Sequence, residues 1–285
     1  MNSVRSNLNS YLFVGLFLVN VFIWQAVFAG ERNGILTVAF LDVGQGDAIF
    51  IEAPNGNQVL IDGGANKSVL RQLSNVMPFY DRSIDIVLAT HPDKDHIGGL
   101  VSVLERYKVE KILESGVKSN TGVYQSLQNI ILEREVSRIL ARRGMTIVLD
   151  DGIFLNILFP DRDVSGIESN DASIIAQLVY GETEFLFTGD APQKIERYLA
   201  SIYGKALQSD VLKVSHHGSK TSSSQQFIGF VSPDYAVISA GRDNRYGHPH
   251  KEVLETFEQF EIKILSTYEE GTILFESDGE SIFVR

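Results

Sequence analysis

The sequence contains no cysteine among its 285 residues. It therefore has no disulfide, no thiolate nucleophile, no iron–sulfur cluster and no cysteine-ligated zinc. Positive charge is also scarce, because 25 lysines and arginines face 36 aspartates and glutamates and leave a net charge of −11. This balance excludes a nucleic-acid-binding module that works by positive charge alone. Any bound metal has to use histidine, aspartate, glutamate, asparagine or backbone oxygen.

Long apolar runs are equally rare, because only the N-terminus has one. Residues 11–29 are almost wholly apolar, and residues 1–30 carry a single charge, Arg5. This length suits a short membrane-spanning helix, on the order of 20 residues, and also a secretory signal cut after Ala29; a buried helix is the third reading. The first two readings place the rest of the chain outside the cytoplasmic membrane, with Arg5 inside. With no second run, a polytopic channel is not expected.

The remaining residues, 31–285, alternate β-rich and helical segments, and we expect them to form one domain. Strands are predicted at 35–43, 48–52, 58–61, 84–89, 146–159, 173–180, 184–187, 211–214 and 235–239, and three short strands close the chain. Helical periodicity is found at 100–107, 123–143, 191–202 and 252–260. Two halves that each combine strands with helices fit a single α/β domain with helices outside two packed sheets.

The histidines are the most informative feature, because they fall in three short segments. The six are His91, His96, His216, His217, His248 and His250. Each segment follows a predicted strand, and no histidine lies between His96 and His216. Binding and catalytic residues concentrate on loops held by a rigid scaffold, so these clusters indicate one site on one rim of the domain.

The segment THPDKDHIGG, residues 90–99, holds four potential metal ligands. His91, Asp93, Asp95 and His96 are spaced at i, i+2, i+4 and i+5. On a loop, this spacing lets alternate side chains reach two neighbouring points. Imidazole and carboxylate together suit a borderline or hard divalent cation. A polar turn, the alternative, would not need two histidines and two aspartates.

Three further segments add potential ligands. Asp190 ends a buried strand after a glycine, where a carboxylate can approach and bridge two cations, although such a dipeptide alone is also a common turn. His216 and His217 are adjacent, so on an extended chain they point to different sides and only one is expected to bind metal directly. Residues 246–250 contain His248, and a solvent-exposed loop is the alternative there.

Together these motifs resemble the metallo-β-lactamase fold, and in particular the soluble domain of ComEC-type competence proteins, the DNA-uptake channel family. The matching segments follow the family's order over residues 35–285: FLDVGQGDA at 40–48, IDGG at 61–64, the motif at 91–99, NDAS at 170–173, TGD at 188–190, KVSHHGS at 213–219 and YGHPH at 246–250. The combination is specific, although no single segment is. The family's multi-span channel is missing from the sequence, so the resemblance is to a stand-alone, secreted or singly anchored form.

The resemblance implies a four-layer αββα sandwich with two divalent metal ions at the strand ends. The implied ligands are His91 and Asp93 for the first metal, Asp95, His96 and His217 for the second, and Asp190 as a bridge. His216 is implied as a further ligand or as a group that orients His217. His248 is implied as a proton donor to the leaving group or as a hydrogen-bond partner of a ligand.

The sequence departs from the superfamily pattern at two points. The common HxHxDH motif is HxDxDH here, with Asp93 in place of the second histidine. The histidine that usually precedes the bridging aspartate is absent, and Asn170 or Asp171 lies near its place. Oxygen ligands in place of nitrogen favour Mn²⁺ or Mg²⁺ relative to Zn²⁺. We therefore expect a weaker first site, which substrate would help to fill.

Two such cations generate hydroxide at neutral pH and stabilise attacking and leaving oxygens, and Asp95 is placed to orient the hydroxide. The favoured interpretation is an extracytoplasmic phosphodiesterase or nuclease that acts on DNA and is related to competence. It would use zinc or manganese, or magnesium at the first site. Asp62 is expected to support a ligand or a turn. The stretch 211–251 is locally positive, and the side chains expected to touch substrate there are Lys213, Ser219, Lys220, Arg242, Arg245, Tyr246 and Lys251.

Two other classes of function stay open. One is an extracytoplasmic hydrolase of another bond, in a phosphocholine ester, a lactone or, least favoured, a lactam. The other is a metal-stabilised domain without turnover that binds DNA or a channel partner. The expected partners are DNA as substrate, the membrane through an uncut N-terminal segment, and a separate DNA-uptake channel subunit.

Overall fold

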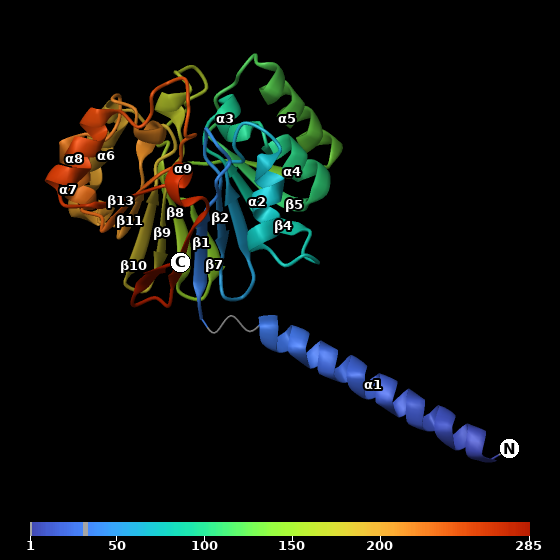
Figure 1. Cartoon of the computed structure of the whole chain (residues 1–285). Helices are drawn as coiled ribbons and strands as arrows, with labels where there is room; N and C mark the ends of the chain where they lie inside the picture. The colour runs from blue at the N-terminus through green and yellow to red at the C-terminus, as the bar shows by residue number, and fades with distance from the viewer. Residues whose placement is uncertain (1, 31–33) are drawn as a thin grey trace.

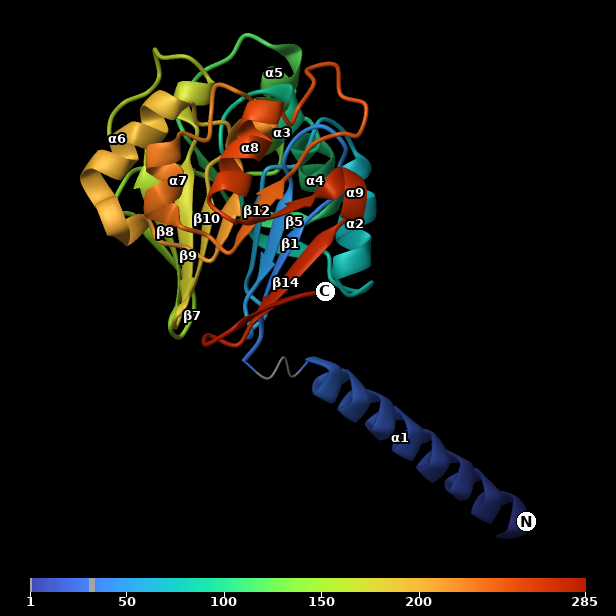
Figure 2. The ribbon, with the colours of Figure 1, turned by 60° about the vertical axis from the view of Figure 1, so that its left-hand side comes forward.

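The computed structural model describes the backbone of residues 2–30 and 34–285, with side chains at 10–25 and from residue 34 onward. Helix α1 (Asn2–Gly30) projects away from the rest of the molecule (Figures 1 and 2). Its described side chains are all exposed, which disagrees with a helix buried in the domain. Within the described residues, no helix combines the length and apolarity needed to cross a membrane. The predicted cleavage point adjoins 31–33, which lie outside the described residues, so signal and anchor both stay predictions.

Residues 34–285 form two sheets that pack face to face. In spatial order, the first sheet contains β15 (Ile282–Val284), β14 (Ile273–Ser277), β1 (Leu36–Phe40), β2 (Ile49–Glu52), β3 (Gln58–Ile61), β4 (Ser83–Ala89), β5 (Lys108–Glu114) and β6 (Ser137–Leu140). The second contains β13 (Lys263–Ser266), β12 (Tyr235–Ile238), β11 (Val211–Lys213), β10 (Thr183–Phe187), β9 (Ile175–Tyr180), β8 (Ile153–Phe159) and β7 (Thr146–Asp150). The strands from β3 to β6 are parallel, as are those from β10 to β13.

Helices cover the outer face of each sheet (Figure 2). The first sheet carries α2 (Ser68–Val76), α3 (Lys94–Ile97), α4 (Leu100–Arg106) and α5 (Gly122–Glu133). The second carries α6 (Gln193–Tyr203), α7 (Gln225–Val231) and α8 (Lys251–Gln259), while the short α9 (Thr267–Glu270) follows β13. Short 3-10 helices occupy Asn170–Ala172, Gly204–Leu207 and Ser215–Gly218. This arrangement confirms the predicted four-layer αββα sandwich.

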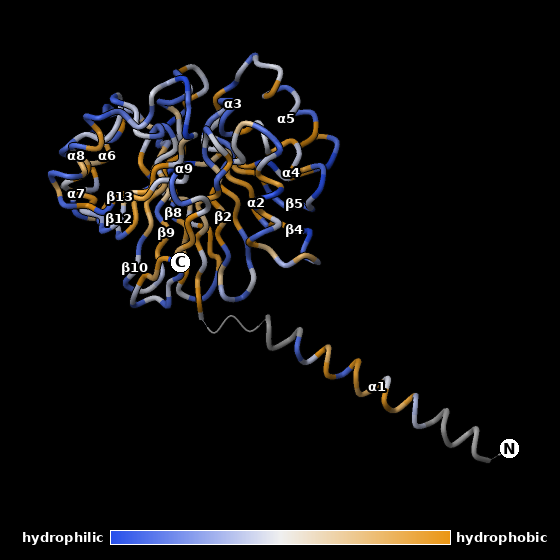
Figure 3. The backbone as a smooth tube through the Cα atoms, in the orientation of Figure 1, coloured by the Kyte–Doolittle hydropathy of each residue, from blue (hydrophilic) through white to orange (hydrophobic). Residues whose placement is uncertain are grey.

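The inner strands β1, β2, β3 and β11 are buried on both faces, which explains their nearly continuous apolar sequences. Alternate side chains of a strand point to opposite faces. In β1, Val38 and Phe40 belong to the core between the sheets, whereas Ala39 packs under the helices of the first sheet. Phe40 also joins the two sheets through Phe187 of β10, with ring centroids 6.2 Å apart. Apolar residues therefore follow the strands, and polar ones gather in the loops (Figure 3).

Two element predictions were wrong in their boundaries. The helix predicted at 123–143 ends at Glu133, and Ser137–Leu140 is strand β6. Glu135 has a φ of 54°, and this left-handed conformation ends the helical path. The single strand predicted at 146–159 is a hairpin of β7 and β8, turned at Gly152 with a φ of 75°. Apolar periodicity extends through the first turn and hides it in the sequence. The second turn is marked by Asp151-Gly152, a hairpin signal that the strand prediction passed over.

Candidate metal centre

The predicted ligands come from loops at the carboxyl ends of neighbouring strands. His91 follows β4, Asp190 follows β10, and His216 and His217 follow β11. Strands β10 and β11 are parallel, so their carboxyl ends meet at the same edge of the sheet. Ligand sites of open α/β sheets lie at such edges. The structure therefore brings segments more than 100 residues apart in the chain to one rim.

The ligands predicted for the second metal converge on Asp190. The Nε2 atom of His96 lies 3.2 Å from Asp190 Oδ1. The Nε2 atom of His217 lies 3.4 Å from Asp190 Oδ2 and 3.4 Å from Asp95 Oδ2. One ligand atom from each of Asp95, His96 and His217 lies within 4.8 Å of the others. These residues are brought together as the sequence predicted.

The residues predicted for the first metal are arranged more openly. His91 is buried, and its Nε2 atom lies 3.9 Å from Asp190 Oδ2 and 3.8 Å from Asp93 Oδ2. The Asp93 side chain is 46% exposed, and its Oδ1 atom accepts a 2.7 Å hydrogen bond from Ser169 Oγ. Burial and repulsion from His96 lower the pKa of His91, so its imidazole is neutral and available to a cation.

The outer nitrogen of each buried imidazole is held by the protein. Nδ1 of His96 lies 2.7 Å from Asp62 Oδ2, and Nδ1 of His217 lies 2.8 Å from the carbonyl oxygen of Ser239. Asp62 also accepts hydrogen bonds from the backbone and side chain of Thr90. Both Asp62 oxygens are thus occupied, which places this residue behind His96 and not among the atoms open to a metal. Such outer contacts fix the orientation of metal-binding histidines.

Several inward-facing atoms of the cluster have no hydrogen-bond partner although they are buried. They are Nε2 of His91, His96 and His217, and Oδ1 of Asp190. An unsatisfied buried polar atom typically costs about 1–3 kcal/mol. Imidazole nitrogens and carboxylate oxygens facing one another are the donor set that divalent cations require. The residues present therefore fit a metal centre with more than one ion.

The charges of the cluster reinforce one another. Burial alone would lower the pKa of His96, but the charges of Asp190 and Asp62 raise it well above its usual range. The pKa of His217 is raised in the same way, against burial, by Asp190 and Asp47. Burial opposes ionisation of Asp190, yet His217 and His96 hold its pKa well below the usual value. In the metal-free protein His96 and His217 are therefore protonated, and metal binding that displaces these protons strengthens as pH rises.

A buried ion pair that the sequence analysis missed lies directly beneath this cluster. The Nζ atom of Lys213 is 2.7 Å from Asp47 Oδ2 and donates a 2.8 Å hydrogen bond to the carbonyl oxygen of Val214. Both charged side chains are almost fully buried, and Asp47 Oδ1 lies 3.2 Å from His217 Nδ1. The expectation that Lys213 touches phosphates is therefore wrong. Its place at the end of a fully apolar strand was the only signal of burial.

The short helix α3, which carries Asp95, packs directly against Gly46. A Cβ atom on Gly46 would lie 2.0 Å from the Asp95 carbonyl oxygen, and the glycine has a φ of 119°. Gly44 also has a positive φ, of 80°, but a Cβ there would meet nothing within 4 Å. Replacing Gly46 by alanine would therefore introduce both a steric clash and backbone strain, whereas replacing Gly44 would introduce backbone strain alone.

We expect Gly46→Ala to displace helix α3 and with it Asp95, and so to lower metal affinity at least about tenfold, because misplacing residues around a metal site typically costs this much. Gly44→Ala should cost only the strain of a left-handed alanine, about 1–2 kcal/mol of stability. Metal titration and urea unfolding of both variants measure the two effects. Equal metal affinities in the two variants would show that the contact between Gly46 and the Asp95 backbone does not position the metal ligands.

The predicted substrate-contacting and auxiliary residues divide into two groups. Arg245 and Tyr246 line a groove beside Asp95. The others are engaged elsewhere: Asp171 forms an ion pair with Lys194, Arg242 donates to the carbonyl oxygen of Tyr268, Ser219 hydrogen-bonds Thr221, and Lys251 pairs with Glu255. Lys220 is exposed, and Asn170 starts the 3-10 helix that holds Asp171.

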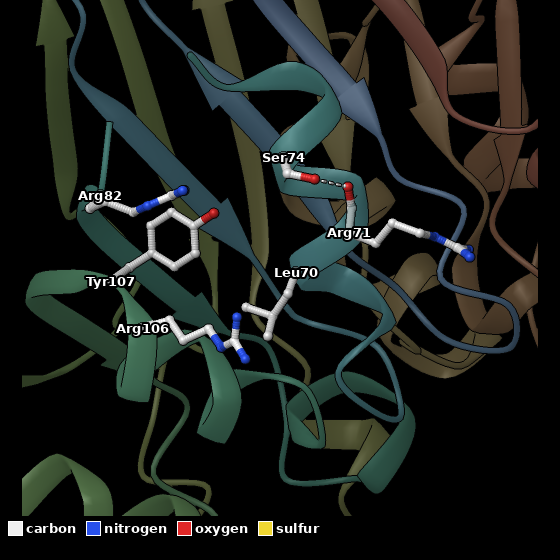
Figure 4. Close-up of a pocket in the computed structure, with 6 residues that line it drawn as sticks. All are labelled: Leu70, Arg71, Ser74, Arg82, Arg106 and Tyr107. Carbon is white, nitrogen blue, oxygen red and sulfur yellow. Dashed lines mark hydrogen bonds between the residues drawn. The ribbon is translucent and has the colours of Figure 1, made fainter. Parts of the chain in front are cut away.

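The groove beside Asp95 has a volume of about 440 Å³. It is lined by Gln45, Ala65, Lys94, Asp95, Asn244, Arg245 and Tyr246. The sequence analysis missed Lys94, although it lies inside the histidine motif between Asp93 and Asp95. A larger hollow of about 610 Å³ lies between α2 and α4 (Figure 4). It contains arginines but no histidine or carboxylate, so it is separate from the candidate centre.

His248 completes the rim of the cluster. Its ring stacks on Tyr246 with centroids 5.6 Å apart and lies 5.5 Å from the ring of His216. Burial, followed by repulsion from His217, lowers the pKa of His248 to about 4. The imidazole is therefore neutral at pH 7, which suits hydrogen bonding better than the predicted proton donation.

Comparison with known proteins gives this geometry a family context. Residues 41–242 match the family model described as the metallo-beta-lactamase superfamily. The chain is 32% identical over 256 residues to ComE operon protein 3 of Bacillus subtilis, covering 84% of this chain and 32% of that protein. It is 32% identical over 249 residues to competence protein ComA of Neisseria gonorrhoeae, covering 86% of this chain and 32% of that protein.

These matches confirm the predicted resemblance to ComEC-type competence proteins. The chain spans about a third of the length of both relatives. The solved structure of Igni18, a metallo hydrolase from Ignicoccus hospitalis, aligns with a TM-score of 0.53 at 15% identity, covering 85% of this chain and 98% of that one. At this identity the likeness concerns the fold alone, and it agrees with the sandwich described above.

Proposed function

We propose that this chain, which belongs to the metallo-beta-lactamase superfamily, is a two-metal phosphodiesterase that cleaves DNA outside the cytoplasmic membrane. The observation that carries the proposal is the environment of Asp190, whose carboxylate lies within 4 Å of an Nε2 atom of four histidines: His91, His96, His216 and His217. One carboxylate among four imidazoles is suited to bridge two cations. A phosphodiester needs such a clamp because negative charge builds up on its oxygens during hydrolysis.

The proposed ligands are those that the family resemblance implies, and the metals are zinc or manganese, with magnesium as an alternative at the first site. When bound, two such ions supply hydroxide at neutral pH and stabilise the attacking and leaving oxygens. Burial opposes ionisation of Asp95, but the close approach of His217, whose Nε2 atom lies 3.4 Å from Asp95 Oδ2, and the charge of His96 hold its pKa below the usual value. Asp95 is therefore a carboxylate at pH 7 and can accept a hydrogen bond from the attacking water. Neutral His248 can hydrogen-bond the leaving oxygen.

The groove beside Asp95 supports a nucleic-acid substrate. Lys94 and Arg245 place positive charge along it, although the chain as a whole is acidic. The Arg245 guanidinium lies 4.9 Å from the centroid of the Tyr246 ring and donates a 2.7 Å hydrogen bond to its hydroxyl oxygen. Cations that contact phosphates and an aromatic ring that stacks on a base are recurring parts of single-strand binding grooves.

The names of relatives support DNA over other substrates and a role in competence. One is named competence protein ComA, another is named ComE operon protein 3, and a third, from Haemophilus influenzae, is named recombination protein 2. The extracytoplasmic location is proposed from the apolar segment 11–29, as a cleaved signal or as an anchor. The proposed partner is a separate DNA-uptake channel subunit.

The test is turnover by the full-length chain, purified in detergent, stripped of metal and reloaded with Mn²⁺, Mg²⁺ or Zn²⁺. DNA, a phosphocholine ester and a lactone serve as parallel substrates. We expect DNA to be cut only by metal-loaded protein, and chelation to stop the reaction. Hydrolysis of an ester with intact DNA would support the second class of function. DNA binding that survives chelation, without turnover of any substrate, would support a binding domain.

A further inference from the structure

Compared with the superfamily pattern, the first metal site lacks the histidine that usually precedes the bridging aspartate. Asn170 and Asp171, which lie near its place in the sequence, do not supply a nitrogen ligand. No histidine occurs between His96 and His216, so the segment before Asp190 carries none. Asp171, one of the two residues expected near this place, has its Oδ2 atom paired with Lys194. Asn170 offers only an amide, which is a weak ligand for zinc or manganese beside imidazole. This ligand position of the first metal therefore has to be occupied by a residue of another segment or by water.

His216 lies where such a ligand is needed. Its Nε2 atom is 3.7 Å from Asp190 Oδ2, the same oxygen that lies 3.9 Å from His91 Nε2. These separations are too long for hydrogen bonds, whose N···O distances are about 2.7–3.2 Å. Two atoms that share a cation at bonds of about 2.0–2.2 Å lie roughly 3–4 Å apart. The distance of each histidine nitrogen, His216 Nε2 and His91 Nε2, from Asp190 Oδ2 thus fits contact with this oxygen through an ion.

The ring of His216 is anchored as metal-binding histidines are. Its Nδ1 atom lies 3.1 Å from Thr221 Oγ1, which leaves Nε2 facing Asp190. Its backbone N–H donates a 3.1 Å hydrogen bond to the carbonyl oxygen of Gly189. This bond ties His216 to Gly189, the residue that directly precedes Asp190. A histidine that is fixed by one nitrogen while the other points at a carboxylate is preorganised for a cation.

The backbone explains how two adjacent histidines can serve two metals. His216 has φ 50° and ψ 42°, and His217 has φ 55° and ψ 22°. Each left-handed non-glycine residue costs roughly 1–2 kcal/mol, and such strain concentrates at functional sites. The two rings are 6.2 Å apart and inclined at 72°. The prediction that only one of them binds metal assumed an extended chain, which the structure does not have here.

We propose that His216 is a ligand of the first metal through Nε2, with His91, Asp93 and the shared Asp190, while His217 serves the second metal. This assignment rests on the proposed two-metal function. It gives the first site two imidazoles and two carboxylates, in place of the oxygen-rich set expected from the sequence. Such a mixed set binds zinc or manganese without help from substrate.

The experiment is titration of the full-length chain in detergent with Mn²⁺. Calorimetry measures the number of ions bound and their affinities, and electron paramagnetic resonance measures whether the bound ions are spin-coupled. The wild type should bind two ions per chain and show the spectrum of a spin-coupled pair. His216→Ala should bind one ion at wild-type affinity and the other at least about tenfold more weakly, with the spectrum of an isolated ion. Thr221→Val, which frees Nδ1, should weaken the same ion by a smaller factor.

His250→Ala is the matched control, because this neighbouring histidine accepts a hydrogen bond from the Lys220 backbone and lies outside the cluster. It should bind two ions like the wild type, and equal melting of the metal-free proteins establishes that each variant folds. Two ions at unchanged affinity in His216→Ala, or loss of both ions alike, would overturn the assignment. A wild type that binds two ions but cuts no DNA would refute the proposed function and leave this assignment standing.

Discussion

Asp190→Ala is expected to lower kcat/KM for metal-dependent DNA cleavage by about 10³-fold or more. The carboxylate lies within 4 Å of histidines assigned to both metals, so its loss removes the bridge and leaves four imidazoles without a shared carboxylate. Removal of a single electrostatic contact in an active site already costs about 10²–10³-fold, and loss of a shared ligand adds a loss of metal. Initial rates on a fluorescent DNA substrate, with bound metal measured in parallel, test this.

Asp163→Ala is a suitable control for that variant. Asp163 is exposed and lines a different hollow, together with Glu114 and Arg138. Its replacement removes the same charge from the chain but should leave rate and metal content unchanged. Substantial cleavage by Asp190→Ala, with two metals still bound, would show that the bridging role is wrong. Residual cleavage that chelators do not inhibit would instead indicate a contaminating nuclease.

Lys213→Met is expected to destabilise the fold by about 3–5 kcal/mol. The substitution keeps the length of the side chain but leaves the Asp47 carboxylate buried without its cation, and breaking a buried pair typically costs this much. Urea unfolding of the metal-free protein, followed by circular dichroism, measures the loss. Lys251→Met is the matched control, because Lys251 pairs with Glu255 on the surface of α8 and should change stability little.

The double variant Asp47→Asn/Lys213→Met tests the cause. Removing both charges should recover much of the stability, so the two substitutions should be strongly non-additive.

The pH dependence of stability provides a second test. Burial opposes ionisation of Asp47, but Lys213 holds the pKa of Asp47 below the usual value. The pair therefore stabilises the fold above the unfolded-state pKa of about 3.9 and loses this effect as pH falls. Additive losses, or a deficit in Lys213→Met that persists in acid, would contradict the account.

The sequence predicts the parts of the site that lie close together in the chain. His91, Asp93, Asp95 and His96 fall within six residues, so one loop brings them together whatever surrounds it. Asp190 was predicted because a glycine and a carboxylate ending a buried strand mark a rim. Helices outside two packed sheets were predicted for a similar reason, since apolar strands and amphipathic helices have different periods. The four-layer αββα sandwich itself was implied by the resemblance to the metallo-β-lactamase fold.

Contacts between distant segments could not be predicted in this way. The Asp47–Lys213 pair joins a loop of the first sheet to a strand of the second, and charge in a sequence normally indicates exposure. Lys94 looks like an ordinary surface lysine until the loop at residues 244–246 closes the other side of its groove. The proposed binding of different metals by His216 and His217 depends on their left-handed backbone angles, which the local sequence does not predict.

The most direct test of the account is the rate of DNA cleavage as a function of bound metal. Metal-free full-length protein is titrated with Mn²⁺, and the rate and the number of ions bound per chain are recorded at each addition. The account predicts little cleavage at one ion per chain and a rise to the full rate as the second ion binds. Full activity with one ion, or no cleavage of DNA with two ions bound, would contradict a two-metal phosphodiesterase.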